Sequence, residues 1–247
     1  MRAQLAGRSN PTRRCAMYDV TLTLVDLNPK MIAAWQTVFD AEPGVEIVQG
    51  SLLDERVSAW VSPTNSRALM DGGLDGAIRA RLGAGIQARV RRAVTSTYGD
   101  FMPVGAASCV ATGRALPAYL ISTPTMLSSA EDVSSTMNVA LACAAALQAV
   151  RMQNRAAPGS VRSVAMSGLG AGTGRVPFTV CAELMWAAWH LFQHHIFEGF
   201  DDMRAALEHE LGDLGPVSLS GSPAPRRASR GPVLPTPFHG YHHRAIA

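Results

Sequence analysis

Apolar and polar positions along the chain form patterns that predict strands and helices in turn. Short, nearly continuous apolar runs are typical of buried strands, and longer runs with apolar residues three or four positions apart are typical of helices. The predicted strands cover 20–27, 45–49, 57–61, 104–111, 119–122 and 161–166. The predicted helices cover 29–42, 76–82, 86–94, 131–153, 178–197 and 201–211. Strands that alternate with helices predict an α/β fold, a three-layer α/β/α arrangement around a mixed, largely parallel central sheet.

The strand at 57–61 leads into a segment that combines an Asn with a glycine pair and an Asp. Residues 62–78 read Ser-Pro-Thr-Asn-Ser-Arg-Ala-Leu-Met-Asp-Gly-Gly-Leu-Asp-Gly-Ala-Ile. A strand followed by a glycine-containing loop and a helix start gathers backbone N–H groups and the positive helix end around one point, which suits a phosphate. The alternative interpretation is an ordinary turn at Gly72-Gly73, with Asp71 or Asp75 as the N-cap of the helix.

A second loop of the same kind follows the strand at 161–166. Residues 167–177 read Ser-Gly-Leu-Gly-Ala-Gly-Thr-Gly-Arg-Val-Pro, and a largely apolar helix comes next. In open α/β sheets, ligands bind outside the carboxyl ends of the strands. Because both loops follow strands, we expect them to emerge at the same edge of the sheet, which favours one shared binding site over two unrelated turns.

Positive charge is concentrated in the two terminal segments. Residues 1–16 carry four arginines and no acid, and residues 212–247 carry four arginines and one Asp. Since the whole chain has a net charge of +3, residues 17–211 carry −4. This balance gives no support to a specific nucleic-acid-binding face on the folded part, although a basic segment can contact any polyanion weakly.

The composition favours a globular protein with a polar segment at each end. Hydrophobic residues make up 47% of the chain and charged residues 17%, and no apolar run is long enough to cross a bilayer. We therefore expect a polar arm at 1–17, one folded domain at 18–211 and a disordered tail at 212–247 that is rich in Pro, Gly, Ser and Arg. The histidines of the tail are expected to be solvated, so no metal site and no cofactor are predicted.

Cysteine usage indicates a reducing compartment. The four cysteines form no CxxC pair and have no metal-like spacing, and three of them lie in apolar surroundings typical of buried thiols. The N-terminal segment has arginines but no apolar core, so it is not expected to be a secretory signal. It is either a short segment of the transit-peptide type or an extension upstream of a start near Met17. We expect a cytoplasmic protein that does not contact a membrane.

Together, the two loops resemble those of a macrodomain, the ADP-ribose-binding fold, over roughly Val20 to Phe197. The family's first motif is a strand, then Asn-Ala-Ala-Asn, then a glycine run and Val-Asp-Gly-Ala-Ile. Here these positions are occupied by Ser62-Pro63-Thr64-Asn65 and Gly72-Gly73-Leu74-Asp75-Gly76-Ala77-Ile78. The second motif is a strand, a glycine-rich phosphate loop and a helix that begins at a Pro, which matches Val161 to Pro177.

The resemblance implies roles for the residues of both motifs. Asn65 would hydrogen-bond the distal ribose hydroxyls, and Gly72 and Gly73 would let the backbone pass close to that ribose. In the hydrolytic branch of the family, Asp75 would orient a water molecule at the anomeric carbon, so Asp75 and Asn65 are the candidate catalytic residues. The second loop would bind the diphosphate through the main-chain N–H groups of Ser167, Gly168, Leu169, Gly170, Ala171, Gly172, Thr173 and Gly174.

The chain departs from the family pattern where the adenine would bind. The usual Gly-Asp-Ile, whose Asp contacts the adenine amino group, is replaced by Gly50-Ser51-Leu52. Ser51 then occupies the adenine position, and Asp26 or Asp54 could substitute for the missing acid.

The second loop departs from the pattern as well. It is longer than usual and lacks an aromatic residue to face the ribose, which leaves Phe178 as the nearest candidate. Arg175 is unusual in this loop and would either bind a phosphate or face solvent.

Three functions are compatible with these features. The leading hypothesis is a macrodomain that binds ADP-ribose and hydrolyses a conjugate of it: a mono-ADP-ribosylated protein, O-acetyl-ADP-ribose or ADP-ribose 1″-phosphate. The second is a reader module that binds ADP-ribose or a nucleotide without catalysis, which the altered adenine position favours. The third is a Rossmann-type methyltransferase, suggested by the Asp at the end of the first strand, but the glycine fingerprint that should precede such an acid is missing. The expected partner is ADP-ribose or an ADP-ribosylated substrate, and the sequence does not predict the oligomeric state.

Overall fold

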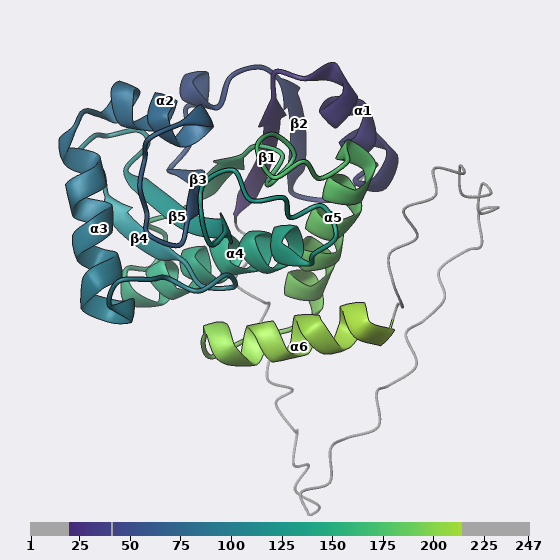
Figure 1. Cartoon of the computed structure of the whole chain (residues 1–247). Helices are drawn as coiled ribbons and strands as arrows, with labels where there is room; N and C mark the ends of the chain where they lie inside the picture. Colours follow the sequence, from purple (N-terminus) through teal and green to yellow (C-terminus); the bar gives the residue numbers. More distant parts are fainter. Residues whose placement is uncertain (1–19, 41, 214–247) are drawn as a thin grey trace, which may run out of the picture. The chain divides into compact units, whose positions relative to one another are not determined.

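The computed structural model describes residues 20–40 and 42–213, so the predicted polar arm and all but the first two residues of the predicted tail lie outside the described residues (Figure 1). The strands are β1 (Thr21–Asp26), β2 (Val45–Gln49), β3 (Ala59–Asn65), β4 (Ser108–Ala111), β5 (Tyr119–Met126) and β6 (Ser163–Met166). The helices are α1 (Pro29–Val38), α2 (Gly73–Leu82), α3 (Gly85–Tyr98), α4 (Asn138–Ala156), α5 (Phe178–His194) and α6 (Phe200–Asp213). A short 3-10 helix, η2 (Leu52–Asp54), connects β2 to β3.

The strands form one sheet in the order β2-β1-β6-β3-β5-β4. Neighbouring strands are parallel except for β4, which runs antiparallel to β5. This confirms the predicted mixed, largely parallel sheet. Strand β6, which precedes the second glycine-rich loop, lies next to β3, which precedes the first. Because these two strands are parallel, their carboxyl ends share one edge of the sheet.

Helices cover both faces of the sheet, which gives the three layers that the sequence predicts (Figure 1). Successive strand residues face opposite layers: Leu24 belongs to the apolar cluster that includes α1, α4, α5 and α6, and Val25 belongs to the cluster that includes α2 and α3. Val61 and Trp60 divide between the two clusters in the same way. Burial on both faces explains why the strands have almost continuous apolar sequences. No helix within the described residues is both long and apolar enough to span a membrane.

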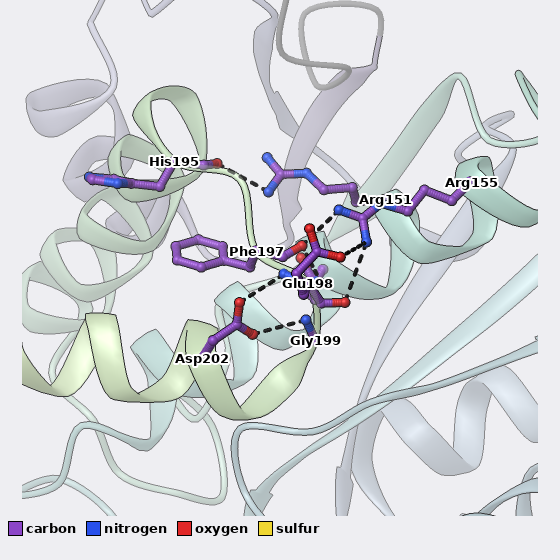
Figure 2. A network of polar contacts seen from close by, with 8 residues as sticks. Arg151, Arg155, His195, Phe197, Glu198, Gly199 and Asp202 are labelled. Carbon is purple, nitrogen blue, oxygen red and sulfur yellow. Dashed lines mark hydrogen bonds and ion pairs between the residues drawn. The ribbon is translucent and has the colours of Figure 1, made fainter. Parts of the chain in front are cut away.

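The segment between α5 and α6 is fixed by polar contacts, many of them with helix α4 (Figure 2). Arg151 of α4 is buried and donates to the carbonyls of Phe192 and His195, at the end of α5, over 3.1 Å each. Carbonyls in the last turn of a helix have no partner within the helix, so the guanidinium supplies the missing donors. At the start of α6, the Asp202 carboxylate accepts from the N–H groups of Glu198 and Gly199 over 2.8 and 2.9 Å.

Several boundaries differ from the prediction. Strand β3 continues to Asn65, because its polar end pairs with β5. Helix α4 begins at Asn138 instead of 131, since the Glu131 carboxylate accepts from the N–H groups of Leu127 and Ser128 over 2.7 and 3.3 Å and closes a turn. Strand β4 begins at 108 instead of 104, after a turn in which Gly105 has a φ of +86°.

Candidate functional site

A cavity of about 390 Å³ opens at the carboxyl edge of the sheet, between the ends of β1, β3, β5 and β6 and the loops that follow them. Small-molecule sites in proteins have volumes of roughly 300–1,000 Å³. The predicted site residues that line it are Ser51, Asn65, Gly72, Gly73, Asp75, Ser167, Gly168, Gly170, Gly172, Thr173 and Gly174. The structure thus brings the two glycine-rich loops together around one cavity.

Asn65 ends strand β3 and is tied to the loop that follows it. Its Oδ1 accepts from the N–H groups of Arg67 and Leu69 over 3.0 and 3.3 Å. Its Nδ2 donates to the Leu69 carbonyl over 3.3 Å and to the Ser129 hydroxyl over 3.2 Å. Asn side chains that bond to nearby backbone groups stabilise turns in this way. Asn65 therefore shapes the first loop, and a ligand hydroxyl that binds it must share or replace one of these bonds.

The glycine pair forms the start of helix α2. Gly72 is the N-cap and provides no side-chain cap, so the first N–H groups of the helix lie at the cavity without an intrahelical acceptor. Gly73 has a φ of +52°, a conformation that favours glycine. A Cβ at either position would meet no atom within 4 Å. The alternative interpretation of Asp71 or Asp75 as the N-cap is wrong, because Asp75 is the third residue of the helix.

Asp75 places a buried carboxylate at the cavity wall, with 5% of its surface exposed. Its Oδ1 accepts from the Ser62 hydroxyl, and its Oδ2 has no hydrogen-bond partner among the residues that the structure describes. Burial raises the pKa of Asp75 from 3.8 to about 6, although the hydroxyls of Ser62 and Thr64 lower it. A carboxyl group with this pKa is ionised near neutral pH and can accept a proton there. A shifted, partly unpaired carboxylate in a cavity is typical of a functional site.

The second loop offers main-chain donors to the cavity. Among the described residues, the N–H groups of Gly170, Gly172, Thr173 and Gly174 have no hydrogen-bond acceptor. Leu169 and Ala171 do not line the cavity: Leu169 is buried in the apolar core, and Ala171 packs against that core. In this loop, Leu169 and Ala171 pack inward, and the other residues of 167–174 border the cavity.

Packing requires glycine at some positions of the second loop and not at others. A Cβ on Gly168 would lie 2.6 Å from the Met31 sulfur, and one on Gly174 would lie 2.7 Å from the Gly170 carbonyl oxygen. A Cβ on Gly172 would meet nothing within 4 Å. The glycines at 168 and 174 therefore allow the close approach of chain segments, whereas Gly172 keeps space open at the cavity.

The adenine corner predicted from the family resemblance contains Ser51 and Asp26. The Ser51 hydroxyl oxygen accepts from the Leu53 N–H over 3.2 Å, so it caps η2. Asp26 lines the cavity, and its two oxygens accept from the N–H groups of Asn28 and Gly168 over 2.8 and 3.2 Å. Of the two acids proposed as substitutes, Asp26 lies at the cavity, whereas Asp54 is exposed and does not line it.

The sequence did not predict a further wall of the cavity, formed by the end of β5 and the segment before α4. Thr125, Met126, Ser129 and Ala130 belong to it. A hydrogen bond of 3.0 Å from the Val133 N–H to the carbonyl of Gly174 connects this segment to the second loop. The signal that could have revealed it is the polar end of a strand parallel to β3, because that end must lie at the same edge.

Arg175 and Phe178, which the sequence suggested as possible ligand contacts, lie away from the cavity. Arg175 is exposed and forms an ion pair with Asp132 over 3.6 Å, and Phe178 packs partly buried against the core. The described residues that line the cavity include three aspartates and no Arg, Lys, His or aromatic residue. Within the described part of the chain, no cluster of three or more His, Cys, Asp or Glu side chains is arranged to hold a metal ion.

Comparison with known proteins places the site region in a family. Residues 61–185 match the model of the Macro domain. A macro domain-containing protein of Streptomyces griseus is 35% identical over 96 residues, which are 38% of this chain and 54% of that protein. The chain thus spans about half the length of the curated relative.

Two solved structures are similar to this chain at low identity. The macrodomain of Mycobacterium tuberculosis DarG is 21% identical, with a TM-score of 0.49 and coverage of 58% of this chain and 88% of that one. An Oceanobacillus iheyensis macrodomain solved with ADP is 15% identical, with a TM-score of 0.49, and the match covers 67% of this chain and 90% of that one.

Proposed function

Because this chain belongs to the Macro domain family, we propose that its cavity binds ADP-ribose and that the protein hydrolyses an ADP-ribose conjugate. The substrates that suit this chemistry are a mono-ADP-ribosylated acidic side chain, O-acetyl-ADP-ribose and ADP-ribose 1″-phosphate. In this assignment the diphosphate contacts the loop at 167–174, and the distal ribose lies beside Asn65, Gly72 and Gly73. The scissile bond then lies next to Asp75.

Main-chain donors support the diphosphate position. Among the described residues, the cavity walls carry three aspartates and no basic side chain, so none of these side chains neutralises a phosphate. The available donors are the N–H groups of the second loop and of the first turn of α2, whose positive helix end also attracts an anion. Glycine at 72 and 172 keeps the backbone accessible to a ligand.

The buried carboxylate of Asp75 is the observation that best supports hydrolysis. Its Oδ2 has no hydrogen-bond partner in the described part of the chain, and its pKa of about 6 leaves the carboxylate ionised at neutral pH. In the proposed step, Asp75 orients a water molecule and accepts its proton as the water oxygen bonds to the attacked carbon, and the leaving oxygen departs with the electrons of its bond to that carbon. The attacked carbon is the anomeric carbon in an ADP-ribosylated acidic side chain and in the 1″-phosphate, and the acyl carbon in O-acetyl-ADP-ribose. General-base catalysis of this kind contributes roughly 10²- to 10⁴-fold to a rate.

A reader module that binds ADP-ribose without cleaving it is the second candidate. The adenine corner favours it, because Ser51 replaces the acid that the family resemblance leads us to expect and already caps η2. Asp26 is also engaged by two N–H groups. A ligand that sits differently in the cavity would place its anomeric carbon away from Asp75.

An activity assay separates the two candidates. We expect the wild-type protein to release ADP-ribose from a mono-ADP-ribosylated protein, and Asp75→Ala to reduce turnover at least about 100-fold. Asp100→Ala, which removes an exposed carboxylate outside the cavity, serves as the control and should retain wild-type turnover. Calorimetry with ADP-ribose, ADP and NAD measures binding in parallel. If the wild type binds ADP-ribose but cleaves no conjugate, the hydrolase assignment fails and the reader module remains.

A further inference from the structure

Strand β3 carries two buried hydroxyl side chains on the face that it presents to helix α2. Ser62 and Thr64 are two residues apart, so they lie on the same face of the strand as Trp60, which packs in the apolar cluster with α2 and α3. Ser62 is 0% exposed and Thr64 3% exposed. Buried hydroxyl groups cost free energy unless they form hydrogen bonds, so their presence here calls for a specific contact.

The contact of Ser62 is with Asp75. The Ser62 hydroxyl donates to Asp75 Oδ1 and thereby joins the middle of β3 to the first turn of α2. Asp75 Oδ2 and Thr64 Oγ1 are both buried, and neither has a hydrogen-bond partner of normal geometry among the described residues, although the Thr64 hydroxyl lies close enough to lower the pKa of Asp75. Both residues line the cavity. The carboxylate is thus held by one oxygen, and its other oxygen is buried in the cavity wall near a second hydroxyl, that of Thr64.

From this arrangement we propose that Ser62 is a positioning residue, which holds Asp75 through Oδ1 so that Oδ2, beside the Thr64 hydroxyl, faces the water that Asp75 activates. This inference rests on the proposed hydrolytic function. Ser62 lies behind Asp75 and does not itself line the cavity, so it acts on the reaction only through the carboxylate. A donor on Oδ1 fixes the rotamer of the side chain and favours its ionised form.

The hydrogen bond from Ser62 also opposes the effect of burial on the pKa of Asp75. Burial raises the pKa of Asp75, and the hydrogen bond from Ser62 is the largest contribution that lowers it. Without the Ser62 hydroxyl, the carboxyl group retains its buried surroundings and loses this donor. Its pKa must then rise further, and a larger fraction of the protein holds Asp75 protonated at neutral pH.

The neighbouring strand provides a matched control. Ser122 of β5 is the register partner of Ser62, is also 0% exposed, and has a hydroxyl without a hydrogen-bond partner. Ser122→Ala is therefore the same chemical change at the same depth in the sheet, without the contact to Asp75. A purely structural requirement for a small polar residue in this layer would affect both variants alike.

The first measurement is an NMR titration of the Asp75 carboxyl carbon, which needs no turnover. Ser62→Ala is expected to raise the pKa of Asp75 by about one unit, because the ionised form loses a hydrogen bond and such a loss changes a pKa by roughly this amount. Ser122→Ala should leave the pKa of Asp75 unchanged. Ser62→Cys, which retains a weaker donor, should give an intermediate pKa and replaces the Ala variant if that one does not fold. An unchanged titration in both Ser62 variants, or an equal shift in Ser122→Ala, would overturn the proposal.

The second measurement is the pH–rate profile of conjugate hydrolysis. In Ser62→Ala, the acid limb should move to higher pH by the shift seen in the titration. The kcat at pH 6 should fall about fivefold, because the ionised fraction of Asp75 falls from about one half to about one tenth. The Kd for ADP-ribose should stay within about twofold, because Ser62 does not touch the ligand. In an Asp75→Asn background, Ser62→Ala should cause no further loss, and an additional loss there would contradict a role through Asp75. A wild-type protein without turnover refutes the proposed hydrolase, while the titration still decides whether Ser62 positions the carboxylate.

Discussion

The buried carboxylate of Asp75 should destabilise the protein at neutral pH, and replacing it with the neutral Asn should reveal by how much. The carboxyl group has a pKa of 3.8 in an unfolded chain and of about 6 in the folded protein, because burial disfavours the charged form. Folding therefore costs free energy whenever Asp75 must be ionised in both states. The Asp75→Asn variant removes the charge and keeps the shape of the side chain.

The magnitude follows from the difference between the two pKa values. Each pKa unit corresponds to about 1.4 kcal/mol, so raising the pKa of Asp75 from 3.8 to about 6 amounts to about 3 kcal/mol. Since the folded-state pKa is the higher one, the protonated carboxyl group carries no such cost, and the full stability of the protein is present below pH 3.8. The free energy of about 3 kcal/mol is lost as the pH rises through about 6. Asp75 is 5% exposed, so solvent screens the effect little.

Urea unfolding at pH 4 and pH 7.5 tests this reasoning. The free energy of unfolding of Asp75→Asn minus that of the wild type should be about 2–3 kcal/mol larger at pH 7.5 than at pH 4, so the variant gains stability relative to the wild type as the pH rises. Comparing the two pH values cancels the direct effects of replacing an oxygen by an amide group. Asp100→Asn, at an exposed position, should show no such pH dependence. The same difference at both pH values would refute the argument, because it would mean that folding does not change the pKa of Asp75.

Four further predictions concern the loops and the helix packing. Gly72→Val should change stability by less than about 1 kcal/mol, because a Cβ there meets no atom within 4 Å, but should reduce turnover at least about tenfold by filling the cavity beside Asp75. Gly168→Ala should instead lower the free energy of unfolding by about 1–3 kcal/mol through the clash with Met31, and thermal unfolding with calorimetry of ADP-ribose binding distinguishes the two effects. Arg151→Ala should destabilise by about 3 kcal/mol, because the carbonyls at the end of α5 lose a buried charged donor, and a change below 1 kcal/mol in urea unfolding would contradict this role. Arg175→Ala should change stability by less than about 1 kcal/mol and leave the Kd for ADP-ribose unchanged, since its ion pair is exposed and lies outside the cavity; a tenfold weaker Kd would show that Arg175 contacts the ligand.

The sequence predicted the convergence of the two loops because that convergence depends on local patterns and on sheet topology. An apolar strand followed by glycine and then by a helix is visible in the residues themselves, both at 57–82 and at 161–194. Parallel strands then bring such loops to one edge without any knowledge of side-chain packing. For this reason the fold and the position of Asn65, Gly72 and Asp75 at one cavity could be expected before the structure was known.

Contacts between distant segments account for what the sequence could not predict. Leu169 belongs to a glycine-rich loop, yet it packs in the core, and its carbonyl accepts from the Cys181 thiol of helix α5 over 3.2 Å. The bond between Ser62 and Asp75 requires the register of a strand against a helix, which neither segment specifies alone. The burial that shifts the pKa of Asp75 is also a property of the assembled layers.

The polar end of β3 shows why the prediction of this strand stopped too early. Hydrophobic periodicity ends at Val61, but Ser62, Thr64 and Asn65 remain buried in the sheet. Their polar groups contact Asp75, the cavity and the first loop, and these contacts replace the apolar pattern that normally marks a strand. The buried polar residues at the end of β3 therefore explain why the predicted strand was too short, and they also mark the position of the cavity.

A crystal structure with ADP-ribose bound tests the central claim most directly. We predict that the diphosphate accepts hydrogen bonds from main-chain N–H groups of residues 167–174, and that the distal ribose lies between Asn65 and Asp75 with its anomeric carbon toward Asp75 Oδ2. A ligand whose diphosphate lies outside this loop, or a cavity that stays empty at saturating ADP-ribose, would contradict the account.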